Sequence, residues 1–303
     1  MTTSPRPLHD PSTSRTGVTS DRAPAASPAG HSVPAGPRPN GGPVGLVARA
    51  ALPQLRASVR TPEFAVGAVG VPLLLYAMFG LTNASAVLPG GTSVGLAMLV
   101  SMSAYGVVSL AIFTFGEDVA KERGRGWTRT LRATPFPTSV HLAAKVADAL
   151  VLAVVIVAAM SVLAATAAGV SMPVTTWLAL GATMVSGVLL FSTLGFAIAF
   201  VARPRAAAVI ANLVFLPLSF ASGFFVPLSD LPEVLRDVAA FLPTFHFGQL
   251  AYGVAMPAGD VEAWTAAAGR PVWVHLAWVL GSAVALGALA LWAARRESVT
   301  RRG

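Results

Sequence analysis

Long apolar segments alternate with short polar ones along most of this chain, after an N-terminal stretch without apolar periodicity. A helix needs about 20 apolar residues to cross a hydrocarbon core of ~30 Å. Six segments approach or exceed that length, and they are predicted near residues 64–81, 94–115, 142–168, 174–201, 207–227 and 272–293. Pro217 and Gly223 fall inside the fifth segment, where a kink is therefore expected. The pattern predicts an all-α membrane protein with six transmembrane helices.

Lys and Arg are concentrated in alternate connecting segments. Of the 21 basic residues, 19 lie before the first span or in the segments that follow the second, fourth and sixth spans. Basic residues mark the cytoplasmic side of a membrane, so both termini are predicted to be cytoplasmic. The long segment 228–271 contains only Arg236 and Arg270 as basic residues and is predicted to be external.

The regions that flank the spans differ in composition. Residues 1–43 are rich in Pro, Ser, Thr, Gly and Arg, which predicts a disordered cytoplasmic tail. Residues 44–62 place arginines and apolar residues on different faces of a helix, apart from an interruption at Pro53, which predicts an amphipathic helix at the membrane interface. Residues 63–296 would form the six-span domain, and 297–303 a short cytoplasmic tail.

The external segment 228–271 is predicted to form a lid that includes a surface helix. Asp230 and Glu233 have the spacing of a capping box, and Pro232 suits the first turn of a helix. Apolar residues then recur at helical spacing, namely Leu231, Val234, Leu235, Val238 and Leu242. We therefore expect an amphipathic helix on the outer membrane surface, followed by His246 as an interfacial histidine with satisfied hydrogen bonds.

Composition and missing motifs narrow the function. The chain is 54% hydrophobic and 11% charged, with a mean hydropathy of +0.68, which indicates a membrane protein. Its net charge of +8 does not form a basic stripe with aromatic residues, so no nucleic-acid partner is expected. The sequence has no cysteine and no histidines at metal-ligand spacing, which predicts no metal site. No phosphate-binding loop or hydrolase motif occurs, so neither catalysis nor a cofactor is expected in this chain.

A charged island spans residues 116–138, between the second and third apolar segments. It mixes both signs of charge, in Glu117, Asp118, Lys121, Glu122, Arg123, Arg125, Arg129 and Arg132. Trp127 and Leu131 lie four residues apart, on one face of a helix. These residues could serve membrane topology alone, or they could form a docking surface for a partner protein.

The island also carries a resemblance to a known family. Glu117, then Glu122-Arg123, then Leu131 and finally Pro135 follow the pattern of the loop after the second span of ABC-2 type transporter permeases. The pattern is most similar to the drug-resistance and polyketide-antibiotic exporter branch, of which the daunorubicin-resistance permease is typical. A second match runs from Asn212 through Pro217-Leu218-Ser219-Phe220-Ala221-Ser222-Gly223-Phe224-Phe225-Val226-Pro227, and it resembles the family's fifth span and re-entrant segment.

The resemblance covers roughly residues 45–296 and implies partners and residue roles. It implies a separate P-loop ATPase in two copies, which would hold ATP and Mg²⁺, and a second permease chain, expected to be an identical copy. It implies that the island docks on the ATPase through Glu117, Glu122, Arg123, Trp127, Arg129 and Leu131. Residues of a pathway or gate would be Asn212, Pro217, Gly223, Phe224 and Phe225.

Asp148 lies in the third span, one turn from Lys145. The two residues could form an ion pair near the interface, or Asp148 could serve helix packing or coupling. Together these features predict a bacterial cell-membrane permease that exports a small lipophilic or amphipathic molecule, such as a drug, antibiotic or secondary metabolite. The alternatives are export of a polysaccharide or lipid, an ion-coupled secondary transporter, and a membrane scaffold without transport.

Overall fold

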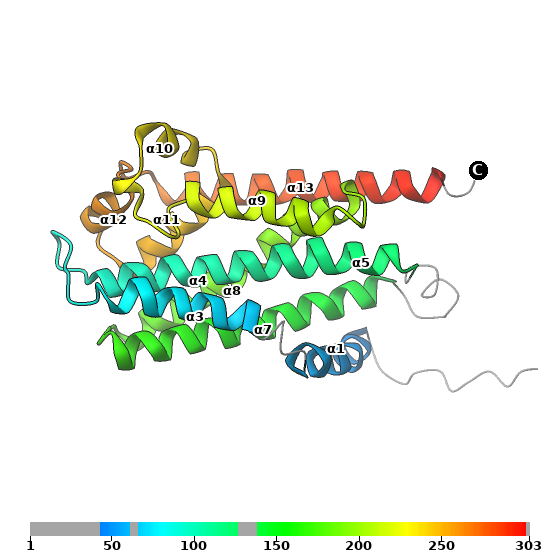
Figure 1. Ribbon diagram of the computed structural model, residues 1–303, viewed down its shortest axis with the longest axis horizontal. Coiled ribbons are helices and arrows are strands. Elements are labelled where there is room, and N and C mark those ends of the chain that lie inside the picture. Colours follow the sequence, from blue (N-terminus) through cyan, green and yellow to red (C-terminus); the bar gives the residue numbers. More distant parts are fainter. Residues whose placement is uncertain (1–42, 61–65, 127–137, 301–303) are drawn as a thin grey trace, which may run out of the picture. The chain divides into compact units, whose positions relative to one another are not determined.

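The computed structural model describes residues 43–60, 66–126 and 138–300, and these residues are almost entirely helical (Figure 1). Within them the extended pairing consists of one isolated bridge between Val87 and Ser93. The prediction of an all-α protein is confirmed. The predicted tail 1–43 lies outside the described residues, except for Pro43.

The long helices begin and end close to the predicted limits. They are α4 (Val94–Ile112), α7 (Thr138–Ala167), α8 (Val174–Val201) and α13 (Val272–Thr300). The first apolar segment forms a π-helical turn η1 (Val66–Gly70), α3 (Val71–Leu75) and a second π-helical turn η2 (Tyr76–Leu81). The fifth forms α9 (Ala207–Ala221).

Four helical stretches of the described chain are long and apolar enough to cross a membrane. They are Val94–Gly124, Ser139–Ala167, Val174–Val201 and Val272–Arg296. The apolar helices Gly67–Leu81 and Ala207–Ala221 are shorter, and at 1.5 Å per residue each is roughly 22 Å long. The structure thus contains all six predicted apolar helices, while six membrane crossings stay a prediction.

The fifth helix ends earlier than the sequence predicts. It was expected to reach residue 227, yet α9 stops at Ala221. Gly223 has φ +77°, in the left-handed region that glycine adopts without strain, and it ends the helix. Pro217 lies inside α9 as predicted.

The segment 228–271, which is predicted to be external, contains three short helices after a single 3₁₀ turn, η4 (Leu228–Asp230). These are α10 (Glu233–Ala239), α11 (Pro243–Ala255) and α12 (Ala258–Thr265). The predicted capping box is wrong, because α10 begins at Glu233 with Pro232 as its N-cap residue and no side-chain cap. Leu231 precedes this proline and is extended (φ −89°, ψ 153°), so the helix cannot start at Asp230.

Some apolar residues of the α10 region pack into the protein, and others are exposed on its surface. Leu231 and Leu242 pack on a small buried cluster of Leu228, Ala239 and Phe245. Val234, by contrast, is 71% exposed on the outer side of α10. This division agrees with an amphipathic helix, although its position on a membrane surface stays a prediction.

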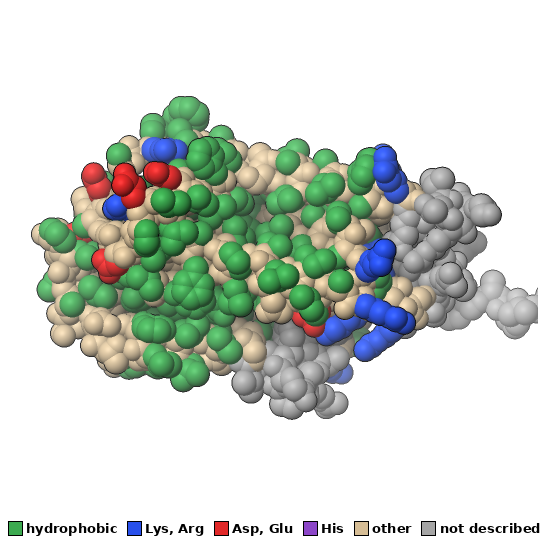
Figure 2. All heavy atoms as spheres, turned by 45° about the horizontal axis from the view of Figure 1, so that its top comes forward, with side chains coloured by type: hydrophobic (Ala, Val, Ile, Leu, Met, Phe, Trp, Pro, Cys, Tyr) green, Lys and Arg blue, Asp and Glu red, His purple; other side chains and the backbone are tan. Residues whose placement is uncertain are grey.

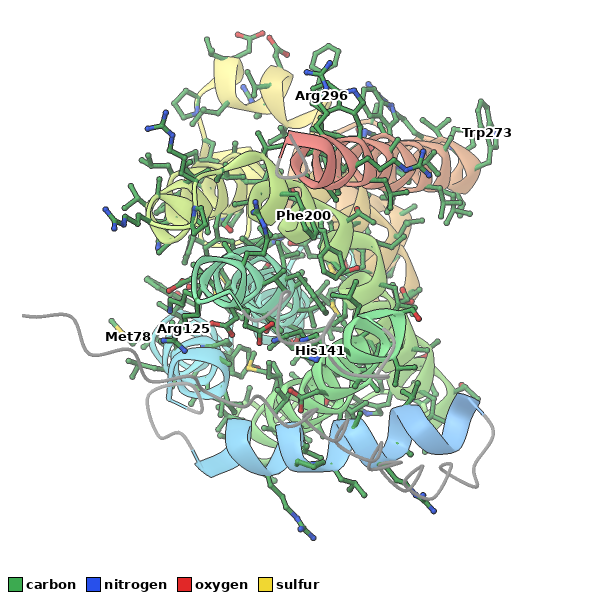
Figure 3. The ribbon with its side chains drawn as sticks, turned by 90° about the vertical axis from the view of Figure 1, so that its right-hand side faces the viewer. Met78, Arg125, His141, Phe200, Trp273 and Arg296 are labelled. Carbon is green, nitrogen blue, oxygen red and sulfur yellow. The ribbon has the colours of Figure 1, made fainter. Side chains whose placement is uncertain are left out.

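Helix α4 lies at the centre of the bundle and packs against α7, α8, α9 and α11. Its side chains are almost all buried, whereas α13 exposes much of its apolar surface. Helix α1 (Pro43–Arg60) packs on α7 and runs crosswise to the bundle (Figures 1 and 3). Apolar side chains cover the middle of the face in Figure 2, while the charged side chains gather toward its two ends.

Candidate functional site

The charged island begins as a continuation of α4. The chain passes from α4 through the π-helical turn η3 (Phe113–Asp118) into α5 (Val119–Gly124), which makes one helix of 31 residues. At 1.5 Å per residue this helix is about 46 Å long, well beyond a ~30 Å hydrocarbon core. Residues 116–124 were predicted as the start of a loop, but they form the C-terminal part of this helix.

Glu122 connects α5 to α7. Its carboxylate forms an ion pair with Nζ of Lys145 at 2.9 Å and contacts Nε2 of His141 at 3.2 Å. Lys145 is buried, while the Glu122 side chain is 31% exposed. Partly buried charge-assisted contacts of this kind are stronger than surface ion pairs. Lys145 therefore lies against Glu122, and its predicted pairing with the buried Asp148 stays a prediction.

Arg123 connects α5 to α8. Its guanidinium is buried and stands over the Phe200 ring at 5.0 Å from the centroid, a cation–π contact. Figure 3 views the bundle from this end, with Arg125, His141 and Phe200 marking the ends of α5, α7 and α8. Glu122 and Arg123 thus hold neighbouring helices of the same chain.

The remaining predicted docking residues divide into two groups. Glu117 forms an ion pair with Lys121 at 2.6 Å, one turn along the same helix, and Lys121 is about half exposed. Trp127, Arg129 and Leu131 lie outside the described residues. The exposed side of α5 therefore presents Lys121, Gly124 and Arg125 at the end of the bundle.

A cavity of about 290 Å³ lies between the first, second and fifth apolar helices. Its lining consists of Gly67, Ala68, Val71, Tyr105, Ser109, Leu110, Phe113, Asn212, Phe215 and Leu216. The predicted pathway residue Asn212 is one of them. The cavity is small for a complete ligand pocket, as expected if a second chain contributes another wall.

Two polar side chains of this cavity form hydrogen bonds to their own helices. Asn212 donates from Nδ2 to the Ala208 carbonyl at 2.9 Å, and Ser109 donates from Oγ to the Gly106 carbonyl at 2.8 Å. The amide nitrogen of Asn212, a predicted pathway residue, is thus bound within its own helix. The wall therefore offers mainly apolar and aromatic surface.

An aromatic cluster forms the side of the cavity. The Tyr105 ring lies 5.0 Å from the Phe215 ring and 4.9 Å from the Phe225 ring, between centroids. Phe113 contacts Phe215 edge-on at 5.4 Å. The predicted gate residue Phe225 thus packs against the cavity wall, whereas its neighbour Phe224 is fully buried and contacts Gly248 of α11.

The sequence reasoning missed Tyr105, Ser109 and Phe215 as lining residues. Tyr105 carries a usable signal, because a tyrosine in the middle of an apolar span is a polar group at membrane depth. Phe215 carries no such signal, since a phenylalanine in an apolar helix is ordinary.

No group of three or more His, Asp or Glu side chains that could hold a metal ion occurs in the described part of the chain. His246 has satisfied hydrogen bonds as predicted, but it is buried in the protein rather than interfacial. Its Nδ1 lies 2.8 Å from Nδ1 of His275, and its Nε2 lies 3.0 Å from the Ala240 carbonyl.

Comparison with known proteins agrees with this geometry. A family model described as "ABC-2 family transporter protein" matches residues 90–292, more than half of the chain. The chain is also 24% identical over 208 residues to "Putative transport permease YvfS" of Bacillus subtilis (strain 168), an alignment that covers 68% of this chain and 84% of that protein. This chain therefore belongs to the ABC-2 transporter family and is a transmembrane permease of that type.

Proposed function

We propose that this chain is the permease subunit of an exporter that moves a lipophilic or amphipathic small molecule out of a bacterial cell. Two identical permease chains would line the route, and two copies of a separate ATPase would drive it. The observation that carries the proposal is the cavity between the first, second and fifth apolar helices. Its wall is aromatic and apolar, and such a wall favours apolar cargo over ions or sugars.

The arrangement of α5 supports a mechanism by which movement of the ATPase would be transmitted to the cavity. Tyr105 and Ser109 line the cavity from the same continuous helix that carries Glu122 and Arg123 at its end. A push on α5 would move this helix together with α7 and α8, because Glu122 and Arg123 hold those neighbours. We therefore assign Glu122 and Arg123 to transmission within the chain, and the exposed residues of the island to docking.

The same proposal places both termini in the cytoplasm with six membrane crossings. The short apolar helices are compatible with crossing, because a bilayer thins locally around a short span and flanking polar residues extend toward the interface. Membership of the drug-resistance branch is part of the proposal, supported by the motif around Glu122 and by the apolar cavity.

The experiment is reconstitution of the chain with its co-purifying ATPase in vesicles, followed by efflux measurements with a panel of lipophilic fluorescent compounds. Phe215→Ala removes a ring from the cavity wall and should change the relative efflux rates of bulky and small compounds several-fold. Phe79→Ala removes a 38% exposed phenylalanine that does not line this cavity and serves as the control. Equal profiles for wild type and both variants would refute this cavity as the route.

A further inference from the structure

Two further cavities adjoin each other at the end of the bundle opposite α5. The first, of about 460 Å³, lies between α8, α11 and α13, and the second, of about 470 Å³, lies between α10 and the segment that joins α12 to α13. Ala267, Arg270 and His275 line both cavities, so the two share a wall. Neither shares a lining residue with the cavity assigned to transport.

The first cavity is predominantly apolar. Its Leu and Val lining comes from four helices, α8, α11, α12 and α13, and comprises Leu190, Leu250, Val254, Val261, Val272, Leu276, Val279 and Leu280. A volume of 460 Å³ lies in the range of small-molecule sites. One polar group is notable, because the buried Nε2 of Gln249 has no hydrogen-bond partner among the described residues. A buried amide without a partner is costly, and an oxygen acceptor on a bound molecule would satisfy it.

The second cavity is lined by charged residues of both signs. Arg236, Asp237 and Arg270 line it, while Glu262 lines the first cavity together with Arg270. Arginine is the side chain best suited to a phosphate, and a carboxylate suits an ammonium group. The charges near the shared wall therefore complement a molecule that carries a phosphate and an amine.

We propose that the two cavities form one site for a membrane glycerophospholipid with a zwitterionic phosphate–amine headgroup. One acyl chain occupies the apolar cavity between α8, α11 and α13. The phosphate lies at Arg270, the amine at Asp237 or Glu262, and an ester carbonyl of the lipid accepts from Gln249. The site uses helices other than those of the transport cavity, so the lipid is a bound component of the protein rather than its cargo.

Two exposed glycines provide a matched pair of variants. Gly253 lines the apolar cavity, whereas Gly281 does not, and a Cβ added at either position meets no atom within 4 Å. Both lie inside helices, Gly253 in the last turn of α11 and Gly281 in the interior of α13, and phenylalanine has a higher helix propensity than glycine at both. Gly253→Phe fills the cavity, and Gly281→Phe is the control.

The test is native mass spectrometry of the full chain. The protein is reconstituted with equal amounts of phosphatidylethanolamine and phosphatidylglycerol and then extracted in mild detergent. Wild type and Gly281→Phe should retain one phosphatidylethanolamine per chain, and Gly253→Phe should lose it. Arg270→Gln, a change on an exposed loop, should weaken retention without filling the cavity.

Three results would overturn the proposal. They are a wild-type protein without retained lipid, a preference for phosphatidylglycerol, and retention by Gly253→Phe equal to that of wild type. No ATPase or cargo is needed for the measurement, so its outcome is separate from that of the proposed transport function.

Discussion

Asp260 of α12 offers the sharpest test of how the outer helices are held. Its side chain is fully buried, and its two carboxylate oxygens accept from the backbone amides of Gly90 at 2.6 Å and Thr92 at 2.9 Å. These bonds join α12 to the turn before α4, about 170 residues away in the sequence. Asp260→Ala removes both acceptors and leaves two amides without a partner.

The expected loss of stability in Asp260→Ala follows from these two hydrogen bonds. A hydrogen bond to a charged group contributes about 1.5–3 kcal/mol, so the loss of both bonds in Asp260→Ala should lower the free energy of unfolding by roughly 3–6 kcal/mol. For a chain of this size that corresponds to a decrease in Tm on the order of 10 °C. Gly90→Ala should also destabilise, because its Cβ would come within 2.6 Å of an Asp260 oxygen. Gly259→Ala is the control, since its Cβ meets no atom within 4 Å.

The same site predicts a dependence on pH. Burial alone would raise the pKa of the Asp260 carboxyl, but hydrogen bonds from the Thr92 hydroxyl and from the Gly90 and Thr92 amides hold that pKa below its ordinary value. A lowered folded-state pKa stabilises the protein above the ordinary pKa of about 4, and this stabilisation is lost as the pH falls through the folded-state value. Asp260→Asn lacks this titration, so the Tm difference from wild type should shrink below about pH 4.

Thermal unfolding of the detergent-purified protein, measured by circular dichroism between pH 7 and pH 3, tests both statements. A variant Asp260→Ala that unfolds within 2 °C (about 1 kcal/mol) of wild type at pH 7 would refute the assigned role of the two bonds. A Tm difference between wild type and Asp260→Asn that stays constant over this range would refute the argument about its pKa.

Two further predictions concern coupling and topology. Glu122→Gln and Lys145→Met should each reduce efflux per ATP hydrolysed by about tenfold, and the double variant should be no worse than either single one, because both remove the same ion pair. Lys121→Gln, on the exposed side, is the control and should leave the internal ion pair intact. Additive losses in the double variant would contradict the pairing. Because the chain has no cysteine, a single cysteine introduced by mutation is the only thiol, and its labelling shows on which side of the membrane it lies. A membrane-impermeant thiol reagent should label Gly259→Cys in intact cells and Lys121→Cys only after lysis. The reverse pattern would overturn the proposed orientation.

The sequence predicted the helices well, because an apolar run of sufficient length has few alternatives to a helix in a membrane. Errors arose where a contact distant in sequence decides the structure. The loop was predicted to begin at residue 116 because charged residues begin there, yet the helix continues to Gly124. Glu122 and Arg123 are accommodated because α7 and α8 supply Lys145 and Phe200, which no local pattern reveals.

The short external helices show a different limit. Asp230 and Glu233 have the spacing of a capping box, but no capping box forms. Pro232 keeps Leu231 extended, so the helix begins only at Glu233. The pairs His246–His275 and Gly90–Asp260 are tertiary contacts between segments that share no pattern. Of the residues that line the cavity, only Asn212 was predicted, as part of the match that resembles the family's fifth span.

The continuous helix from α4 to α5 connects the start of the charged island to the cavity between the first, second and fifth apolar helices. The π-helical turn η3 lies between the cavity residue Tyr105 and Glu122, and π-helical turns often mark functional positions. Gly195 of α8 lies against this region so closely that a Cβ there would come within 2.7 Å of Phe115 Cβ and 2.8 Å of the Ala111 carbonyl oxygen. Helix α8 thus packs closely against η3, and Arg123 contacts Phe200 of α8 beyond η3. Bending at η3 would require α8 to separate from η3. We therefore expect a displacement of α5 to move α4 and α8 together, and Tyr105 of the cavity wall to move with α4.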